Sequence, residues 1–263
     1  MKTSLRLALC FSGIFGVASA GLADVYVANE FPAASASITA YAPTAVGNAA
    51  PVRTIAGALT GLNYPEAVTT DTVNSELYVA DFFGQAVRVF PLNANGDVAP
   101  TRTLINGPNS QIGQVRMAVA DTVNNELIVV TGNNAIKVFP RTASGDAVPL
   151  RTISGANTKL NNPISLIVDS TNNEILTDSY NVGGAQVPGI LVFSRIASGN
   201  VAPLRFISGS NTQMGTYTNY VTLDLVNNEI YAQGNSGNGV VAFPRTASGN
   251  VAPSRDISGR VPA

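Results

Sequence analysis

One stretch of the chain recurs in near copies along most of its length. The copy at residues 138–155 reads VFPRTASGDAVPLRTISG. Its central glycine returns at spacings of 49, 49, 54 and 50 residues, as Gly47, Gly96, Gly145, Gly199 and Gly249. A period of about 50 residues is typical of β-propeller blades. The repeat therefore predicts an all-β, five-bladed β-propeller that forms a single domain over residues 21–263.

Each repeat contains four short apolar segments, which predict a four-stranded blade. In one copy they are residues 165–169, 174–177, 189–193 and 203–207. They are rich in Val, Ile, Leu and aromatic residues and lie between Gly, Pro and Asn clusters, which favours strands over helices. The prolines at positions 51, 100, 149, 203 and 253 are expected to open the fourth strand, at the blade edge where a missing N–H is tolerated.

The first repeat, residues 25–57, lacks the segment for an innermost strand. We therefore expect a three-stranded first blade whose unpaired edge faces the channel. Such an edge is a template for strand addition. Either the neighbouring blades shield it, which would leave a monomer, or it accepts a strand from a partner or a second copy.

Two kinds of turn recur at fixed places in the repeats. The turn between the first and second strands reads Asp-x-x-Asn-Asn/Ser-Glu, as at residues 71–76, and Asn and Asp close tight hairpins through side-chain hydrogen bonds to the backbone. It lacks the glycine bend and alternating ligands of an EF-hand. The turn between the third and fourth strands carries the recurring glycine, which supplies a positive φ.

A column of arginines and a column of glutamates also recur. Arg begins the fourth strand and Glu begins the second, so the two columns are expected about 10 Å apart, within reach of long side chains. As exposed pairs they would contribute about 0–1 kcal/mol, which indicates a device that fixes strand register. The members are Arg53, Arg102, Arg151, Arg205 and Arg255, with Glu76, Glu126, Glu174 and Glu229.

Residues 1–20 have the pattern of a secretory signal peptide. Lys2 and Arg6 precede an apolar run, and Ala18-Ser19-Ala20 forms a small-residue cleavage site. The run is shorter than the roughly 18–20 residues that span a bilayer, so no membrane span is expected after cleavage. These features predict a secreted or periplasmic bacterial protein. Because Cys10 is the single cysteine and lies in this segment, the mature chain has no disulfide and no thiolate metal site.

Composition excludes several classes of function. The chain has 15 basic and 16 acidic residues, so nothing in it attracts nucleic acid. It has no histidine, which removes His metal ligands and Ser-His-Asp hydrolysis. Residues 234–238 lack the last glycine of a Gly-x-Ser-x-Gly nucleophile elbow. No catalytic residue is therefore assigned, and no cofactor is expected.

The sequence ELYVAD at residues 76–81, followed by VRVF at residues 87–90, resembles the repeats of NHL-type and YVTN-type β-propellers. The resemblance covers residues 24–259. It implies the fold, whereas the function stays open, because these families include protein-binding, RNA-binding, carbohydrate-related and lactone-hydrolysing members.

The repeats differ from one another mainly in the loops between strands two and three and between successive blades. These variable loops share one face, where we expect a protein or glycan partner to bind, because aromatic residues lie there beside amides and acids. An alternative for the aromatic residues is that they cap the blades. The candidate contact residues are Glu30, Phe31, Tyr64, Glu66, Asp81, Phe82, Phe83, Gln114, Arg116, Asp178, Tyr180, Tyr217, Tyr220 and Asn235.

Two alternatives to a binding protein remain open. Propeller lactonases, which the chain resembles in fold, bind one axial calcium ion, and four acidic residues expected in loops at one end of the strands could hold such an ion: Glu30, Glu66, Asp81 and Asp178. The ion would make the protein a metal-assisted hydrolase. The sparse charge and repeated architecture also suit a structural surface or matrix component.

Overall fold

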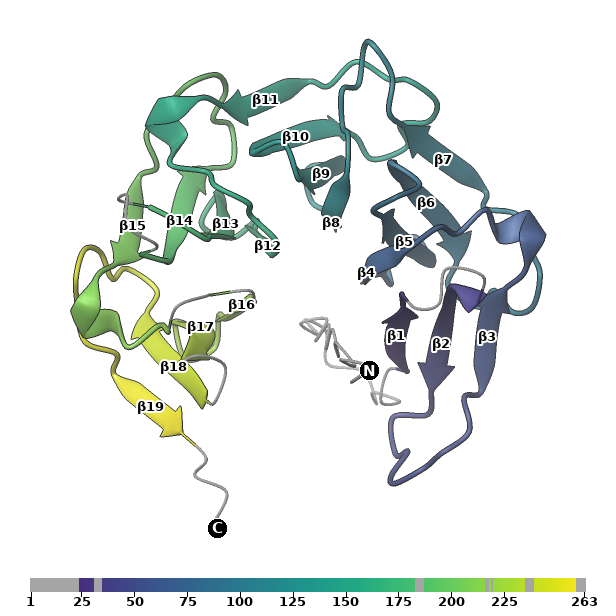
Figure 1. Ribbon diagram of the computed structural model, residues 1–263, viewed down its shortest axis with the longest axis horizontal. Coiled ribbons are helices and arrows are strands. Elements are labelled where there is room, and N and C mark those ends of the chain that lie inside the picture. The colour runs from purple at the N-terminus through teal and green to yellow at the C-terminus, as the bar shows by residue number, and fades with distance from the viewer. Residues whose placement is uncertain are drawn as a thin grey trace.

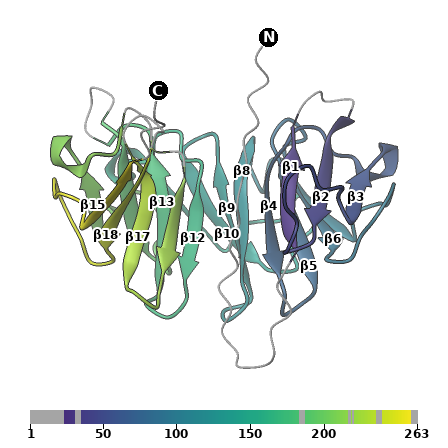
Figure 2. The same cartoon turned by 90° about the horizontal axis from the view of Figure 1, so that it is seen from below.

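The computed structural model describes residues 24–30, 35–182, 187–215, 218, 220–234 and 239–258. Five antiparallel sheets are arranged as the blades of a β-propeller, and the strands of every blade run between the same two ends of the disc (Figures 1 and 2). The predicted fold class is confirmed. The expected signal peptide lies outside the described residues.

Consecutive strands pair within each blade, from the channel outwards. Blade 1 contains β1 (Val25–Asn29), β2 (Ser37–Tyr41) and β3 (Arg53–Ala56). Blade 2 contains β4 (Pro65–Asp71), β5 (Glu76–Asp81), β6 (Ala86–Pro91) and β7 (Arg102–Ile105). Blade 3 contains β8 (Val115–Asp121), β9 (Glu126–Thr131), β10 (Ala135–Pro140) and β11 (Arg151–Ser154). Blade 4 contains β12 (Leu166–Asp169), β13 (Glu174–Ser179), β14 (Gly189–Ser194) and β15 (Arg205–Ser208). Blade 5 contains β16 (Val221–Asp224), β17 (Glu229–Gly234), β18 (Gly239–Pro244) and β19 (Arg255–Ser258).

Blade 1 has three strands, as the sequence predicts. Its innermost strand β1 aligns with the second strand of the other blades and packs against β4 of blade 2. The fourth strands differ slightly from the prediction, because each begins at the arginine two residues after the proline. The proline therefore precedes the strand and removes no ladder hydrogen bond.

The turns adopt the predicted conformations. In the first of them, Asp71 Oδ1 accepts a hydrogen bond from the Asn74 backbone N–H at 2.9 Å, and Asn74 Nδ2 donates to Asp71 Oδ2 at 2.8 Å. Ser75 has a φ of 57°, in the left-handed region. The repeated glycine of the other turn has a positive φ in all five copies.

The core consists of apolar layers between neighbouring blades. In blades 2–4, one face packs against the following blade and the other packs against the preceding blade. At the first boundary, Ile38 and Ile55 of blade 1 meet Leu77, Val79 and Phe90 of blade 2. The phenylalanine is repeated and fully buried in blades 2–5, as Phe90, Phe139, Phe193 and Phe243.

Backbone bonds tie each blade to the next at its outer edge. The turn glycine of one blade forms an isolated parallel bridge with the fourth strand of the preceding blade, as in Ile55 with Gly96. The Gly96 N–H donates to Thr54 O at 2.7 Å, and the Ala56 N–H donates to Gly96 O at 3.2 Å. The same bridge joins blades 2 to 3, 3 to 4 and 4 to 5.

The glutamate column connects blades as well as strands, which corrects the expectation of an exposed pair within one blade. Arg151 binds both carboxylate oxygens of Glu126 at 2.7 Å, and Arg195 of the next blade binds Glu126 Oε2 at 2.8 Å. Glu126 is buried, and hydrogen bonding to Arg151 holds its pKa below the usual value. The second arginine is also present at the equivalent place in two other blades, as Arg141 and Arg245.

The five blades form an arc with blade 1 and blade 5 at its two ends (Figure 1). The innermost strands of consecutive blades pack against each other: β1 against β4, β4 against β8, β8 against β12, and β12 against β16. Between the described strands of blade 5 and those of blade 1 there is no comparable packing. Within the described residues, no helix is long and apolar enough to cross a membrane.

Candidate functional site

The variable loops meet at one end of the strands, and an aromatic cluster of Tyr64, Phe82 and Phe83 lies there on blade 2. Tyr64 immediately precedes β4, and the two phenylalanines follow β5. The ring of Phe83 lies 4.7 Å from Tyr64 and 5.0 Å from Phe82, centroid to centroid, in edge-to-face geometry. Such geometry is favourable for aromatic pairs. Phe82 is buried, whereas Phe83 is 54% exposed and forms the surface of the cluster.

Backbone hydrogen bonds hold the two loops of the cluster together. The Phe82 N–H donates to Tyr64 O at 2.9 Å, and the Gly84 N–H donates to Asn63 O at 3.2 Å. Tyr64 has a φ of 79°, a conformation that costs energy for a residue other than glycine. Its strained backbone places the carbonyl that receives Phe82, so the cluster is fixed before any partner arrives.

Asp81 supports the cluster from below. Its carboxylate accepts the Asn63 N–H at 2.9 Å and binds Arg88 Nε at 2.7 Å, and the residue is fully buried. A Cβ atom on Gly84 would lie 2.1 Å from Asp81 Oδ2. A glycine is therefore required at position 84 for the carboxylate to sit beneath the loop.

A polar chain runs from the aromatic cluster across blades 2, 3 and 4. The guanidinium of Arg116 lies 4.4 Å from the Phe82 ring centroid, which gives a cation–π contact. Arg116 Nη1 binds Glu66 Oε1 at 2.8 Å, and Arg116 Nη2 donates to Asn162 Oδ1 at 3.0 Å. The Asn162 N–H in turn donates to Asn134 Oδ1 at 2.7 Å.

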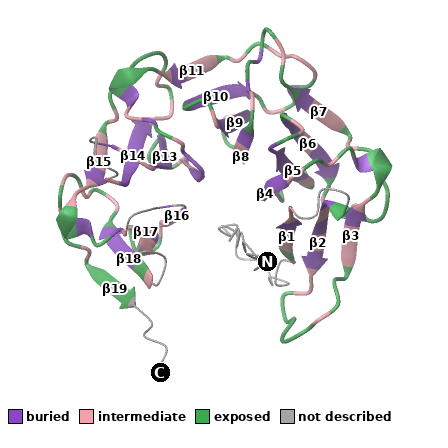
Figure 3. Ribbon diagram, in the orientation of Figure 1, coloured by how far each residue is buried: buried purple, intermediate pink, exposed green. Residues whose placement is uncertain are grey.

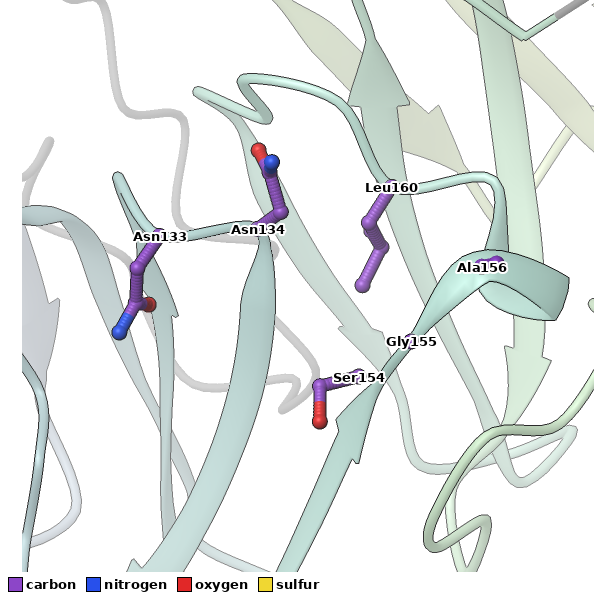
Figure 4. A pocket seen from close by; sticks show the side chains of 6 residues that line it. All are labelled: Asn133, Asn134, Ser154, Gly155, Ala156 and Leu160. Atoms are coloured by element: carbon purple, nitrogen blue, oxygen red, sulfur yellow. The ribbon is translucent and has the colours of Figure 1, made fainter.

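This series of polar contacts ends at a hollow of about 320 Å³ on the same face (Figure 4). It opens between the Asn133–Asn134 hairpin and the segment from Ser154 to Leu160, which leads from blade 3 to blade 4. Amide, hydroxyl and backbone groups line it together with the Leu160 side chain. It carries no titratable side chain, so it suits contact with neutral polar groups rather than acid–base chemistry.

Asp178 lies beneath the loop face of blade 4. Its Oδ1 accepts hydrogen bonds from the Ile164 N–H at 2.8 Å, the Ser165 N–H at 2.6 Å and the Ser165 hydroxyl at 2.9 Å. Burial raises the pKa of Asp178 to about 7, against the opposing effect of these hydrogen bonds. The carboxyl group is enclosed by protein, so a bound partner does not reach it.

The expected contact residues separate into groups. Tyr64, Glu66, Phe82, Phe83 and Arg116 come together as described. The exposed Gln114 accepts the Gly132 N–H through its backbone carbonyl at 2.8 Å. Other half-buried residues lie on different blades: Glu30, Tyr180 and Tyr220. Three lie outside the described residues: Phe31, Tyr217 and Asn235.

The four acidic residues considered for calcium were expected in loops, and this placement is wrong for three of them. Glu66, Asp81 and Asp178 lie in β4, β5 and β13. Glu66 binds Arg116, Asp81 binds Arg88, and Asp178 faces backbone N–H groups. No group of three or more His, Cys, Asp or Glu side chains positioned to hold a metal ion occurs in the described part of the chain.

Sequence reasoning missed the asparagines of this face. Asn134 and Asn162 both have left-handed backbones, with φ of 61° and 45°. Asparagine adopts this conformation more readily than most residues, so each was readable as a turn former. The Asn134 side chain reaches the Asn162 backbone N–H only because the loops of two blades converge.

The chain matches no known protein family model and no curated protein. Its fold is similar to that of many solved structures. One is a Bacteroides fragilis protein provisionally assigned as a 6-phosphogluconolactonase, with a TM-score of 0.61, 17% identity, and coverage of 92% of this chain and 70% of that one. Another is a chain of a nidogen/laminin complex, with a TM-score of 0.62, 14% identity, and coverage of 90% and 76%. At these identities the likeness establishes the β-propeller fold alone.

Proposed function

We propose that the protein is an exported, non-enzymatic binding module that recognises a protein partner through its variable loop face. The observation that carries this proposal is the aromatic cluster. Phe83 is exposed on a base formed by Tyr64 and Phe82, and Arg116 supports that base from blade 3. Aromatic residues and arginine are the side chains that contribute most to protein–protein affinity.

The cluster is fixed in place, which favours binding. The loops that carry it are joined by backbone hydrogen bonds and rest on the buried Asp81–Arg88 pair. A partner therefore does not have to order these side chains, and the entropic cost of association falls. The neutral hollow beside Asn134 lets a polypeptide backbone or a polar side chain extend from the aromatic anchor.

A substitution of the exposed ring tests this proposal. Phe83→Ala removes the anchor and leaves the buried Phe82 in place, so we expect stability to change little and partner retention to fall at least tenfold. Immobilised protein is incubated with periplasmic and culture extract, and retained proteins are quantified by mass spectrometry. The matched control is Val123→Ala, because Val123 is 75% exposed at the opposite end of blade 3.

Two outcomes would contradict the proposal. Equal retention by the wild type and Phe83→Ala would remove the aromatic cluster from the binding surface. Saturable binding on a glycan array that depends on Phe83, with no protein retained, would replace the protein partner by a glycan.

The hydrolase alternative has only fold likeness in its favour. One structural neighbour is provisionally assigned as a 6-phosphogluconolactonase, whereas three of the four acidic residues considered for calcium are held by other groups in this chain. Metal analysis of protein purified without chelator addresses it directly. One equivalent of a divalent ion per chain, together with lactone hydrolysis, would revive this alternative.

A further inference from the structure

The outer face of blade 5 is the surface that a following blade would cover. We define it by Glu229, Tyr231, Val240, Arg255 and Ile257, which alternate along β17, β18 and β19 on the side turned away from blade 4. The corresponding side chains of blades 1–4 form the inter-blade core. The molecule thus contains four formed copies of the interface to which this face belongs.

One cross-strand apolar pair shows the contrast. Val240 and Ile257 are directly opposed, and they are 41% and 61% exposed. The equivalent pairs in the other blades are at most 3% exposed: Ile38 with Ile55, Val87 with Leu104, Ile136 with Ile153, and Ile190 with Ile207. Blade 5 therefore carries the same apolar pair as the other blades, but in blade 5 the pair is exposed to solvent. The strand β19 is exposed as well (Figure 3).

The charged part of the interface is also half-formed. Glu76, Glu126 and Glu174 each bind an arginine of their own blade and one of the following blade. Among the described residues, Arg255 of the same blade is the one arginine that binds Glu229, whose Oε2 also accepts a hydrogen bond from the Tyr231 hydroxyl at 2.8 Å. Arg255 is itself half exposed, whereas the equivalent arginines are largely covered. One guanidinium from outside would complete the pattern.

The backbone bridge that joins successive blades is also missing at the outer edge of blade 5, among the described residues. In the preceding blade boundary, the Gly249 N–H donates to Phe206 O at 2.7 Å, and the Ser208 N–H donates to Gly249 O at 3.2 Å. The equivalent groups of β19 are Asp256 O and the Ser258 N–H. In the described part of the chain, no turn glycine of another blade bridges them.

We propose that the outer face of blade 5 docks a separate partner polypeptide that presents a β-sheet blade. The four formed interfaces define its chemistry: all four have the bridging glycine and the buried phenylalanine, and the three between blades 2 and 5 also have the inter-blade arginine. The partner carries a tight turn with a left-handed glycine that bridges β19, an aromatic residue that covers Val240 and Ile257, and an arginine that reaches Glu229. This surface is distinct from the loop face and does not depend on the aromatic cluster.

A second copy of this chain is a poorer occupant. The face it could offer is that of blade 1, which has the exposed turn at residues 45–48 but carries Pro43 where blades 3–5 have the inter-blade arginine. Blade 1 also presents Thr39 and the half-buried Tyr41 at this surface, with Tyr41 in place of the repeated buried phenylalanine. Blade 1 therefore lacks the arginine and the phenylalanine that cover the equivalent face at the other blade boundaries.

The chain itself supplies a probe for the test. A cyclised synthetic hairpin of residues 189–208 contains Phe193, Arg195 and Gly199, which form these contacts on blade 3 within the molecule. Its binding to the full-length protein is measured by fluorescence anisotropy, after circular dichroism has shown that the free hairpin is folded. We expect saturable binding that Ile257→Asp weakens at least tenfold.

A double-mutant cycle then tests whether Arg195 of the hairpin binds Glu229. Glu229→Gln is expected to weaken the wild-type hairpin at least threefold, and to have no further effect on a hairpin with Arg195→Gln. Val226→Asp is the matched control, because Val226 is 86% exposed in a turn of the same blade. The urea midpoint of Ile257→Asp is compared with that of the wild type. If the two midpoints differ, Val240→Asp is used in place of Ile257→Asp.

Three results would overturn the proposal. The first is a folded hairpin that does not bind. The second is binding that is unchanged by Ile257→Asp and Val240→Asp. The third is concentration-dependent dimerisation in sedimentation velocity that these variants abolish, which would make a second copy the occupant.

Discussion

The outer faces of blade 4 and blade 5 have nearly the same sequence pattern and opposite environments. In blade 4, Ile190 and Ile207 are fully buried against blade 5, and Glu174 binds Arg205 and Arg245. In blade 5, Val240 and Ile257 meet solvent, and Glu229 binds Arg255. The comparison teaches that the repeat encodes an interface whether or not the structure covers it.

The physical reason is that each blade is stabilised mainly by its neighbours. A sheet with two apolar faces cannot bury both of them alone, so repeat proteins depend on contacts between units and on polar surfaces at their ends. Blade 1 has such a surface, with Ser37 and Thr39 bonded to Asn29 on β1. The outer face of blade 5 lacks this adaptation.

The largest expected effect concerns the apolar pair. Ile207→Ala should lower the free energy of unfolding by about 2–5 kcal/mol, because it leaves a cavity between blades 4 and 5. Ile257→Ala should lower it by less than about 1 kcal/mol, because most of that side chain is already hydrated. Urea unfolding of both variants measures the difference. Equal losses would mean that the outer face of blade 5 is covered in solution.

The glutamate column should show a smaller difference. Glu174→Gln removes the charge that holds two arginines across the blade boundary, and we expect a loss of about 1–3 kcal/mol. Glu229→Gln should cost less than about 1 kcal/mol, because its exposed arginine is readily hydrated. The hydrogen bond from Arg205 lowers the pKa of Glu174, so its contribution is present near neutral pH and is lost on acidification. A Glu174→Gln loss that persists at pH 2 would contradict this assignment.

The last comparison concerns the pH dependence of stability and rests on Asp178. By strand alternation it shares the covered face of blade 4 with Leu176, and Gln233 takes its register position in blade 5. Because burial raises the folded-state pKa to about 7, the unfolded chain releases its proton first, and stability falls as the pH rises from about 4 to 7. Asp178→Asn keeps the acceptor oxygen and should remove this decline. We would measure urea midpoints of both proteins at several pH values; parallel curves would show that Asp178 ionises normally.

Much of the fold was readable from the sequence because its signals are local. The turn glycines, the Asp–Asn hairpins and the short apolar segments each depend on residues within a few positions. The three-stranded first blade followed from the absence of one such segment. The arginine that binds the glutamate of the preceding blade is also visible in the sequence, as the Arg in Phe-Pro-Arg or Phe-Ser-Arg. Its partner is far away in the sequence, 69 residues for Arg195 and Glu126, so the pairing could not be predicted.

The candidate site was readable in part. Aromatic residues in variable loops pointed to Tyr64, Phe82 and Phe83, and the structure joins them into one cluster. Asp81 and Asp178 were expected beside them, although both are buried. Sequence gives the chemical type of such residues, whereas their burial depends on the packing of loops from different blades.

The amino-acid sequence by itself determined the repeat, the strand order within blades and the turn chemistry, because these follow from short-range hydrogen bonding and side-chain alternation. Only the tertiary structure decided which faces are covered, because that depends on how one blade is placed against the next. It brought Arg116 onto Phe82 and Glu66, and it left Val240 and Ile257 exposed. The loop face depends on contacts between blades, whereas the outer face of blade 5 is exposed because no described blade packs against it.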